Sequence, residues 1–86
     1  MVHAKDFYFK SCLDVNPGEG WFRSRGNNYL RGAIIGHGDA GAFQSLSILK
    51  KNGYDGYISI EFEGHEDRLI GIKMGHANVK RFWEMA

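Results

Sequence analysis

Apolar and polar residues alternate most clearly over residues 57–63. The side chains of Ile58, Ile60 and Phe62 fall on one face of an extended chain, and the intervening positions carry aromatic, hydroxyl and acidic side chains. This period of two predicts a β-strand whose two faces differ in chemistry. The short segment 2–6, which ends on a charged pair, predicts a second strand whose C-terminal end meets solvent.

A helical spacing precedes the 57–63 strand. Phe43, Leu46 and Leu49 recur at intervals of three and place an apolar stripe on one side of a short helix. Asp39 is the predicted N-terminal cap of this helix, and the pair Asn52-Gly53 marks its end.

A second helix is predicted at the end of the chain, after the acidic residues of segment 64–67. Its interior holds Gly71 and Gly75, one turn apart, and each weakens a helix by about 1 kcal/mol relative to alanine. The sequence therefore predicts either close packing along the glycine face or a helix that begins after Gly71.

Residues 7–38 show neither a period of two nor one of 3.6. Glycine makes up 12 of the 86 residues, about twice its ordinary share, and seven of the glycines fall within residues 18–41. We predict a long irregular loop here. Its aromatic residues argue against disorder and suggest that it folds over another part of the protein.

The predicted order of elements is strand, long loop, helix, strand, helix. This βαβα order predicts two parallel strands joined by a helical crossover. Residues 1–86 are therefore expected to form one α/β domain.

Charge and composition narrow the classes of function. Eleven basic and ten acidic residues leave a net charge of +1, so no nucleic-acid partner is expected, because such binding needs a large basic excess. A single cysteine, Cys12, excludes an intrachain disulfide. No apolar run approaches the ~20 residues that span a bilayer, and the N-terminal residues do not follow the signal-peptide pattern. We expect a cytoplasmic protein that does not contact a membrane.

Ionisable side chains gather at the C-terminal ends of both predicted strands, where parallel α/β folds concentrate function. A period of two puts His3 and Lys5 on one face of the first strand, and Ser59 and Glu61 on one face of the second. An imidazole and a carboxylate that converge there form a half-site for a divalent cation such as Mn²⁺, Mg²⁺ or Zn²⁺. The same spacing also fits a histidine and a glutamate that only face water.

Two further residues are candidates for binding a small molecule. Arg31, which lies among aromatic residues, is the best candidate for an anion clamp. His37 lies between Gly36 and Gly38, so its backbone can approach a ligand closely. The pattern favours the simpler interpretation that Gly-His-Gly is a turn ahead of the helix.

Three segments together resemble a known family. They are Val2-His3-Ala4-Lys5-Asp6, Gly36-His37-Gly38-Asp39 and Leu49-Lys50-Lys51-Asn52-Gly53-Tyr54-Asp55-Gly56-Tyr57-Ile58-Ser59-Ile60-Glu61. This combination resembles the C-terminal portion of the sugar phosphate isomerase/epimerase family, the xylose-isomerase-like TIM barrels. The resemblance implies a βαβα fragment that corresponds to the last two units of a (β/α)8 barrel.

The resemblance also implies a chemistry. Members of this family move a proton next to the carbonyl of a sugar or sugar phosphate, through an enediolate, with a divalent metal ion. Mn²⁺ is the metal that we expect, with Mg²⁺, Co²⁺ and Zn²⁺ as alternatives. His3 and Glu61 match two metal ligands, and Glu61 also matches one of two catalytic acid/base carboxylates. Arg31 and His37 are carried over as substrate contacts.

A complete barrel needs eight βα units in about 250 residues, whereas this chain supplies two. We therefore expect the isolated chain to be inactive, and either to self-associate through uncovered strands or to lack an N-terminal part of the barrel. A noncatalytic α+β module is the main alternative. Its segment 7–38 would bind a carbohydrate or a protein through Trp21, Phe22, Tyr29 and Arg31. A further alternative is a miniature enzyme assembled from several copies.

Overall fold

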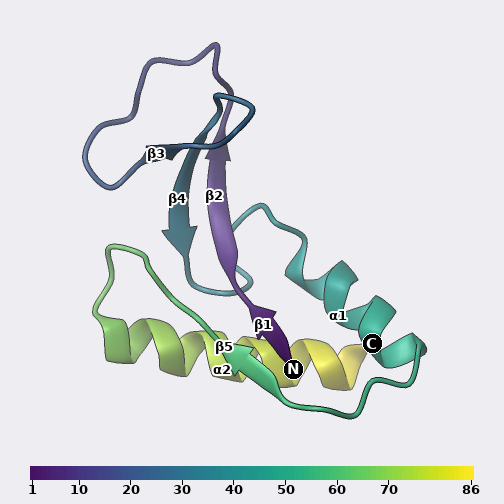
Figure 1. The fold of residues 1–86 in the computed structure, drawn as a ribbon. Helices are drawn as coiled ribbons and strands as arrows, with labels where there is room; N and C mark the ends of the chain where they lie inside the picture. Colours follow the sequence, from purple (N-terminus) through teal and green to yellow (C-terminus); the bar gives the residue numbers. More distant parts are fainter.

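The computed structural model describes residues 1–86, and it has a mixed α/β fold with two helices and five strands in two sheets (Figure 1). Strands β1 (Val2–Ala4) and β5 (Ile58–Ile60) form a parallel two-stranded sheet, with His3 opposite Ser59. Helix α1 (Ala42–Lys51) precedes β5 in the chain. The predicted parallel pair with a helical crossover is confirmed.

Both strands of this sheet are shorter than predicted. The chain that leaves β1 enters a second sheet at Asp6, and residues 61–64 leave β5 to cross that second sheet. The N–H of Glu61 nevertheless still donates to the carbonyl of Ala4, at 3.0 Å. Parallel geometry therefore continues one residue beyond β5.

The second sheet overturns the prediction that residues 7–38 lack regular structure. Three antiparallel strands lie there, in the order β2-β4-β3, and they stand apart from the two helices in Figure 1. They are β2 (Asp6–Lys10), β3 (Phe22–Arg23) and β4 (Tyr29–Ala33).

Residues on both faces of this sheet pack against aromatic rings, which hides the usual alternation of apolar and polar positions. Phe7 contacts Phe22 edge to face on one side, with ring centroids 5.9 Å apart. The next residue along β2, Tyr8, pairs with Arg31 of β4, and its ring lies beneath the Arg31 guanidinium. Position 32 of β4 is a glycine because the backbone of residues 63–64 crosses there, and a Cβ would overlap it.

The hydrophobic core lies where α1, α2 (Arg68–Met85) and the parallel sheet meet, and Ile35, Leu46 and Val79 are its buried residues. The apolar stripe predicted for α1 is confirmed at Leu46. Neither helix has both the length and the apolar composition that a bilayer crossing requires.

Helix α2 confirms the prediction of close packing along its glycine face. Gly71 and Gly75 are both buried. The ring of Phe62 fills the space where a side chain on Gly71 would lie, and a Cβ on Gly75 would sit 3.5 Å from Ile60. The helix begins before Gly71, where the carboxylate of Asp67 accepts the N–H of Ile70 at 3.1 Å.

Asp39 does not cap α1 as predicted. The helix begins at Ala42, after Gly41 in the left-handed conformation. Asp39 instead binds β2, since its carboxylate accepts the N–H of Phe9 at 2.9 Å and its own N–H donates to the carbonyl of Phe7 at 2.6 Å. Asp39 therefore makes a tertiary contact with β2 in place of the predicted cap on α1.

Asp6 organises the segment between β4 and α1. Its side chain is 1% exposed. Its carboxylate accepts four backbone N–H groups at 2.8–3.1 Å, from Phe7, Gly36, Gly38 and Ala40. A buried carboxylate is stable only when such donors replace its lost hydration.

Replacing Asp6 with asparagine should destabilise the fold by about 3 kcal/mol. Each carboxylate oxygen accepts two N–H groups, so the amide nitrogen of asparagine would face two donors. Urea unfolding followed by circular dichroism measures the loss. Asp39→Asn is the matched control, because the exposed Asp39 side chain accepts one N–H. Equal stability of the two variants would contradict the role given to Asp6.

Candidate functional site

His3 and Glu61 lie side by side at the carboxyl edge of the parallel sheet. His3 Nδ1 is 3.3 Å from Glu61 Oε1, and the two side chains are 59% and 44% exposed. Because β1 and β5 run in the same direction, His3 of β1 lies opposite Ser59 of β5, and Glu61, two residues after Ser59, emerges on the same face of the sheet just beyond β5. The juxtaposition predicted from the sequence is present.

Lys5 and Glu63 form a second pair with the same sequence separation of 58 residues. Lys5 Nζ donates to Glu63 Oε1 at 2.9 Å. This hydrogen bond, and then the positive charge of Lys5, lower the pKa of the Glu63 carboxyl. Lys5 lies two residues after His3, and Glu63 lies two residues after Glu61. This equal spacing was the sequence signal for the second pair.

Arg31 lies on the antiparallel sheet, where aromatic rings hold its guanidinium. The guanidinium carbon is 4.6 Å from the ring centre of Tyr8 and 5.8 Å from that of Trp21. Nη1 lies 3.5 Å from Nδ1 of His65. Nε is buried and has no hydrogen-bond partner. Sequence reasoning identified Arg31 but missed its neighbours Tyr8 and His65.

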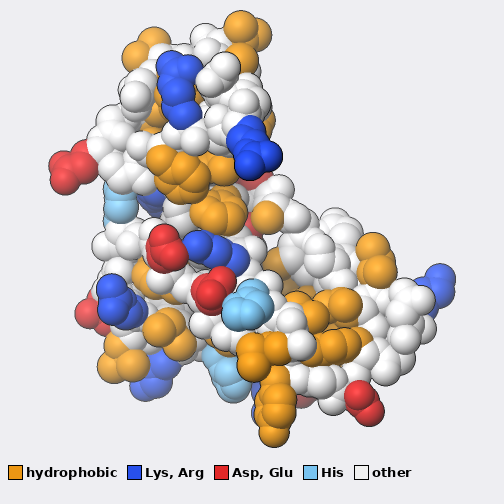
Figure 2. Space-filling model, in the orientation of Figure 1, with side chains coloured by type: hydrophobic (Ala, Val, Ile, Leu, Met, Phe, Trp, Pro, Cys, Tyr) orange, Lys and Arg blue, Asp and Glu red, His pale blue; other side chains and the backbone are white.

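These contacts form one row of side chains that crosses from one sheet to the other. Residues 61, 63 and 65 point in turn at His3, Lys5 and Arg31. We call these three pairs the charged row. Figure 2 shows acidic, basic and histidine side chains close together where the upper sheet meets the lower part of the molecule. No hydrogen bond or ion pair joins Arg31 directly to His3 or Glu61.

His37 is exposed and makes no side-chain hydrogen bond to the charged row. Its N–H donates to the carbonyl of Ile34 at 2.8 Å, which closes a turn. The structure explains why glycines stand on both sides of His37: Gly36 has a φ of 96°, and Gly38 packs directly against Asp6. Its role in substrate binding stays a prediction.

The donor set at His3 and Glu61 fits half of a coordination shell. An imidazole nitrogen and a carboxylate oxygen both suit divalent cations. The structure holds no cluster of three or more histidine, cysteine, aspartate or glutamate side chains that would complete such a site.

Comparison of the chain with protein-family models, with curated proteins and with solved structures finds no match. Functional assignment therefore depends on the geometry of the charged row, together with the motifs in the sequence.

Replacing Lys5 with methionine should raise the pKa of Glu63 toward its ordinary value of 4.5, because the hydrogen bond and the positive charge are lost together. The lowered pKa means that the pair stabilises the fold above about pH 4.5, and that this contribution disappears as the pH falls through the pKa of the folded state. Carbon-13 NMR titration of the Glu63 carboxyl measures the change. Lys10→Met removes an equal charge elsewhere and should leave Glu63 unaffected. Identical titrations in the Lys5 variant and the parent chain would contradict this pairing.

Proposed function

We propose that this chain is the C-terminal part of a metal-dependent sugar or sugar phosphate isomerase/epimerase barrel. His3 and Glu61 would be two ligands of its divalent cation. The observation that supports this most is the 3.3 Å approach of imidazole and carboxylate at the carboxyl edge of adjoining parallel strands. The helical crossover between these strands is the connection that a (β/α)8 barrel repeats.

In this proposal Glu61 moves the proton. Its carboxylate is accessible to a bound sugar and accepts a proton from the carbon next to the carbonyl. His3 acts as a neutral imidazole, since a protonated ring does not bind a cation. The metal, when bound, polarises the substrate oxygens and stabilises the enediolate charge.

Arg31 is the cation of the charged row that lacks a carboxylate partner, whereas Lys5 is paired with Glu63. We therefore assign the phosphate or a hydroxyl group of the substrate to Arg31. The resemblance implies a second catalytic carboxylate from an earlier barrel strand. The isolated chain should therefore bind the cation without turning over a sugar.

Cation binding tests this proposal directly. Titration with Mn²⁺, followed by NMR line broadening, should show broadening centred on residues 3 and 61. His3→Ala and Glu61→Ala should each weaken binding at least tenfold, because each removes one of the two ligands. His76→Ala removes another exposed histidine, on α2, and should have no effect. Equal affinity in all variants, or no binding at all, would contradict the assignment.

The noncatalytic alternative is favoured by one specific observation. The guanidinium of Arg31 rests against the rings of Tyr8 and Trp21, and its buried Nε has no partner. Aromatic rings beside a cation are suited to binding a sugar or an anion. In this alternative the antiparallel sheet binds a carbohydrate without a metal.

Tryptophan fluorescence separates the two functions. A sugar phosphate added in the presence of a chelator should change the emission of Trp21 if the sheet is a binding module. That change should be lost in Arg31→Gln and retained in Glu61→Ala. A response that requires Mn²⁺ and disappears in Glu61→Ala would instead support the isomerase assignment.

A further inference from the structure

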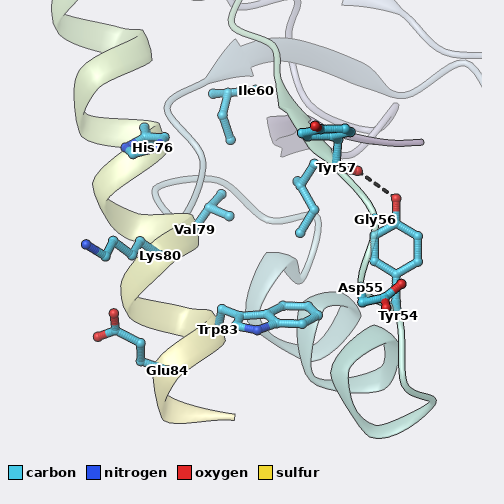
Figure 3. A pocket seen from close by; sticks show the side chains of 11 residues that line it. Tyr54, Asp55, Gly56, Tyr57, Ile60, His76, Val79, Lys80, Trp83 and Glu84 are labelled. Carbon is cyan, nitrogen blue, oxygen red and sulfur yellow. Dashed lines mark hydrogen bonds between the residues drawn. The ribbon is translucent and has the colours of Figure 1, made fainter.

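The largest groove of the molecule lies away from the charged row. It has a volume of about 500 Å³ and lies between the start of β5 and α2, where Tyr54, Val79 and Trp83 line it (Figure 3). No residue of the charged row lines this groove. In the barrel of the proposed function, another strand takes this side of β5. The unused binding capacity of the charged row therefore lies at its other end, at Arg31.

The guanidinium of Arg31 has hydrogen-bond donors that no group of the chain accepts. Nη1 lies 3.5 Å from Nδ1 of His65, whereas Nε is buried and has no partner. A guanidinium N–H can only donate, so the Nε–H group lacks an acceptor. Nε and Nη2 form one edge of the guanidinium, and such an edge binds two oxygens of a carboxylate or phosphate together. The arrangement is therefore suited to an oxyanion.

Arg23, on the same antiparallel sheet, has the partner that Arg31 lacks. Its guanidinium carbon is 4.9 Å from the ring centre of Tyr29, and its Nη2 donates to the hydroxyl of Tyr29 at 2.9 Å. Arg31 lies over the ring of Tyr8 at a similar distance, 4.6 Å, but donates to no oxygen. Contact with a tyrosine ring is thus common to both arginines, and the missing acceptor is specific to Arg31.

Trp21 also lies against the guanidinium, with its ring centre 5.8 Å from the guanidinium carbon of Arg31. Because Nε is buried, a side chain beside it has to move before an oxyanion can enter. Trp21 follows a turn in which its N–H donates to the carbonyl of Gly18 at 3.3 Å, and both Gly18 and Gly20 have a positive φ. We expect the indole to move, so the emission of Trp21 should report binding at Arg31.

The length of the charged row separates Arg31 from the proposed metal ligands. The pair of Lys5 and Glu63 lies between the contact of Glu61 with His3 and that of His65 with Arg31. Alternate residues of an extended chain are about 7 Å apart, so a whole ion pair fills the middle of the row. A group bound at Arg31 is therefore remote from a carbon that reacts at Glu61.

We propose that the substrate is a sugar phosphate whose phosphate is at the end of the sugar opposite the carbonyl, and that Arg31 binds this phosphate through Nε and Nη2. This inference rests on the function proposed above, since the carbonyl end lies at His3 and Glu61. Lys5 does not compete for the phosphate, because Glu63 accepts its hydrogen bond. Contacts at both ends of one molecule reinforce each other.

Two ketose phosphates with the same carbonyl position test this proposal. Fructose 6-phosphate carries its phosphate at the far end, and fructose 1-phosphate carries it next to the carbonyl. With Mn²⁺ present, fructose 6-phosphate should change tryptophan emission at a concentration about tenfold lower than fructose 1-phosphate. The change is assigned to Trp21, because Trp83, the other tryptophan, lines the groove of Figure 3. Arg31→Gln should remove the preference, and Arg23→Gln, the matched control, should retain it.

Line broadening by Mn²⁺ at residues 3 and 61, measured on the same samples, separates the two proposals. If broadening is present but the two isomers bind equally, or Arg31→Gln keeps the preference, the phosphate assignment is overturned and the metal site stands. Absence of broadening overturns both. A response to fructose 6-phosphate that persists with a chelator overturns binding at both ends and favours the noncatalytic module. If circular dichroism shows that Arg31→Gln does not fold, Arg31→Lys decides, because it keeps the charge and loses the paired N–H edge.

Discussion

The buried carboxylate of Asp6 is the contact on which the arrangement of the two sheets depends. It lies at the junction where the chain leaves the parallel sheet and enters the antiparallel one, and it accepts N–H groups from the segment that returns to α1. One side chain thereby joins the start of β2 to the turn at residues 36–40. Gly38 follows from this contact, because a Cβ there would overlap the Asp6 carboxyl group.

The charged row is a consequence of how these sheets are joined. Asp6 fixes the point at which the chain leaves β1 and enters the antiparallel sheet. Residues 61–65 cross from β5 toward β4, and the side chains of residues 61, 63 and 65 each contact one residue of the charged row. Pairs as exposed as His3 with Glu61 add little to stability. Their exposure instead leaves them accessible to a ligand. Beside them, β5 has a hydrogen-bonded neighbour on one side only, so its other edge leaves backbone N–H and C=O groups unpaired.

Local patterns in the sequence were sufficient for the elements that surround the core. The alternation around Ile58 and Ile60 predicted β5, and Asp67 marked the start of α2, because these signals depend on residues within one or two turns. The approach of His3 to Glu61 was also predictable, since a βαβ connection makes strands parallel and the side-chain period then puts both groups at one edge. The substrate roles of Arg31 and His37 are predictions that this geometry leaves open.

The sequence by itself thus determined the helices, the parallel pair and the imidazole–carboxylate contact. Only the tertiary structure decided that residues 7–38 contain a sheet, that Asp39 binds Phe9 instead of capping α1, and that Arg31 packs between aromatic rings. The physical reason is the distance along the chain between the groups that interact. Asp6 takes three of its four N–H donors from residues 30 to 34 positions away, and Gly32 owes its place to a backbone crossing at residue 63. A periodic pattern indicates which face of a segment is buried, but it does not indicate which distant part of the backbone packs against that face.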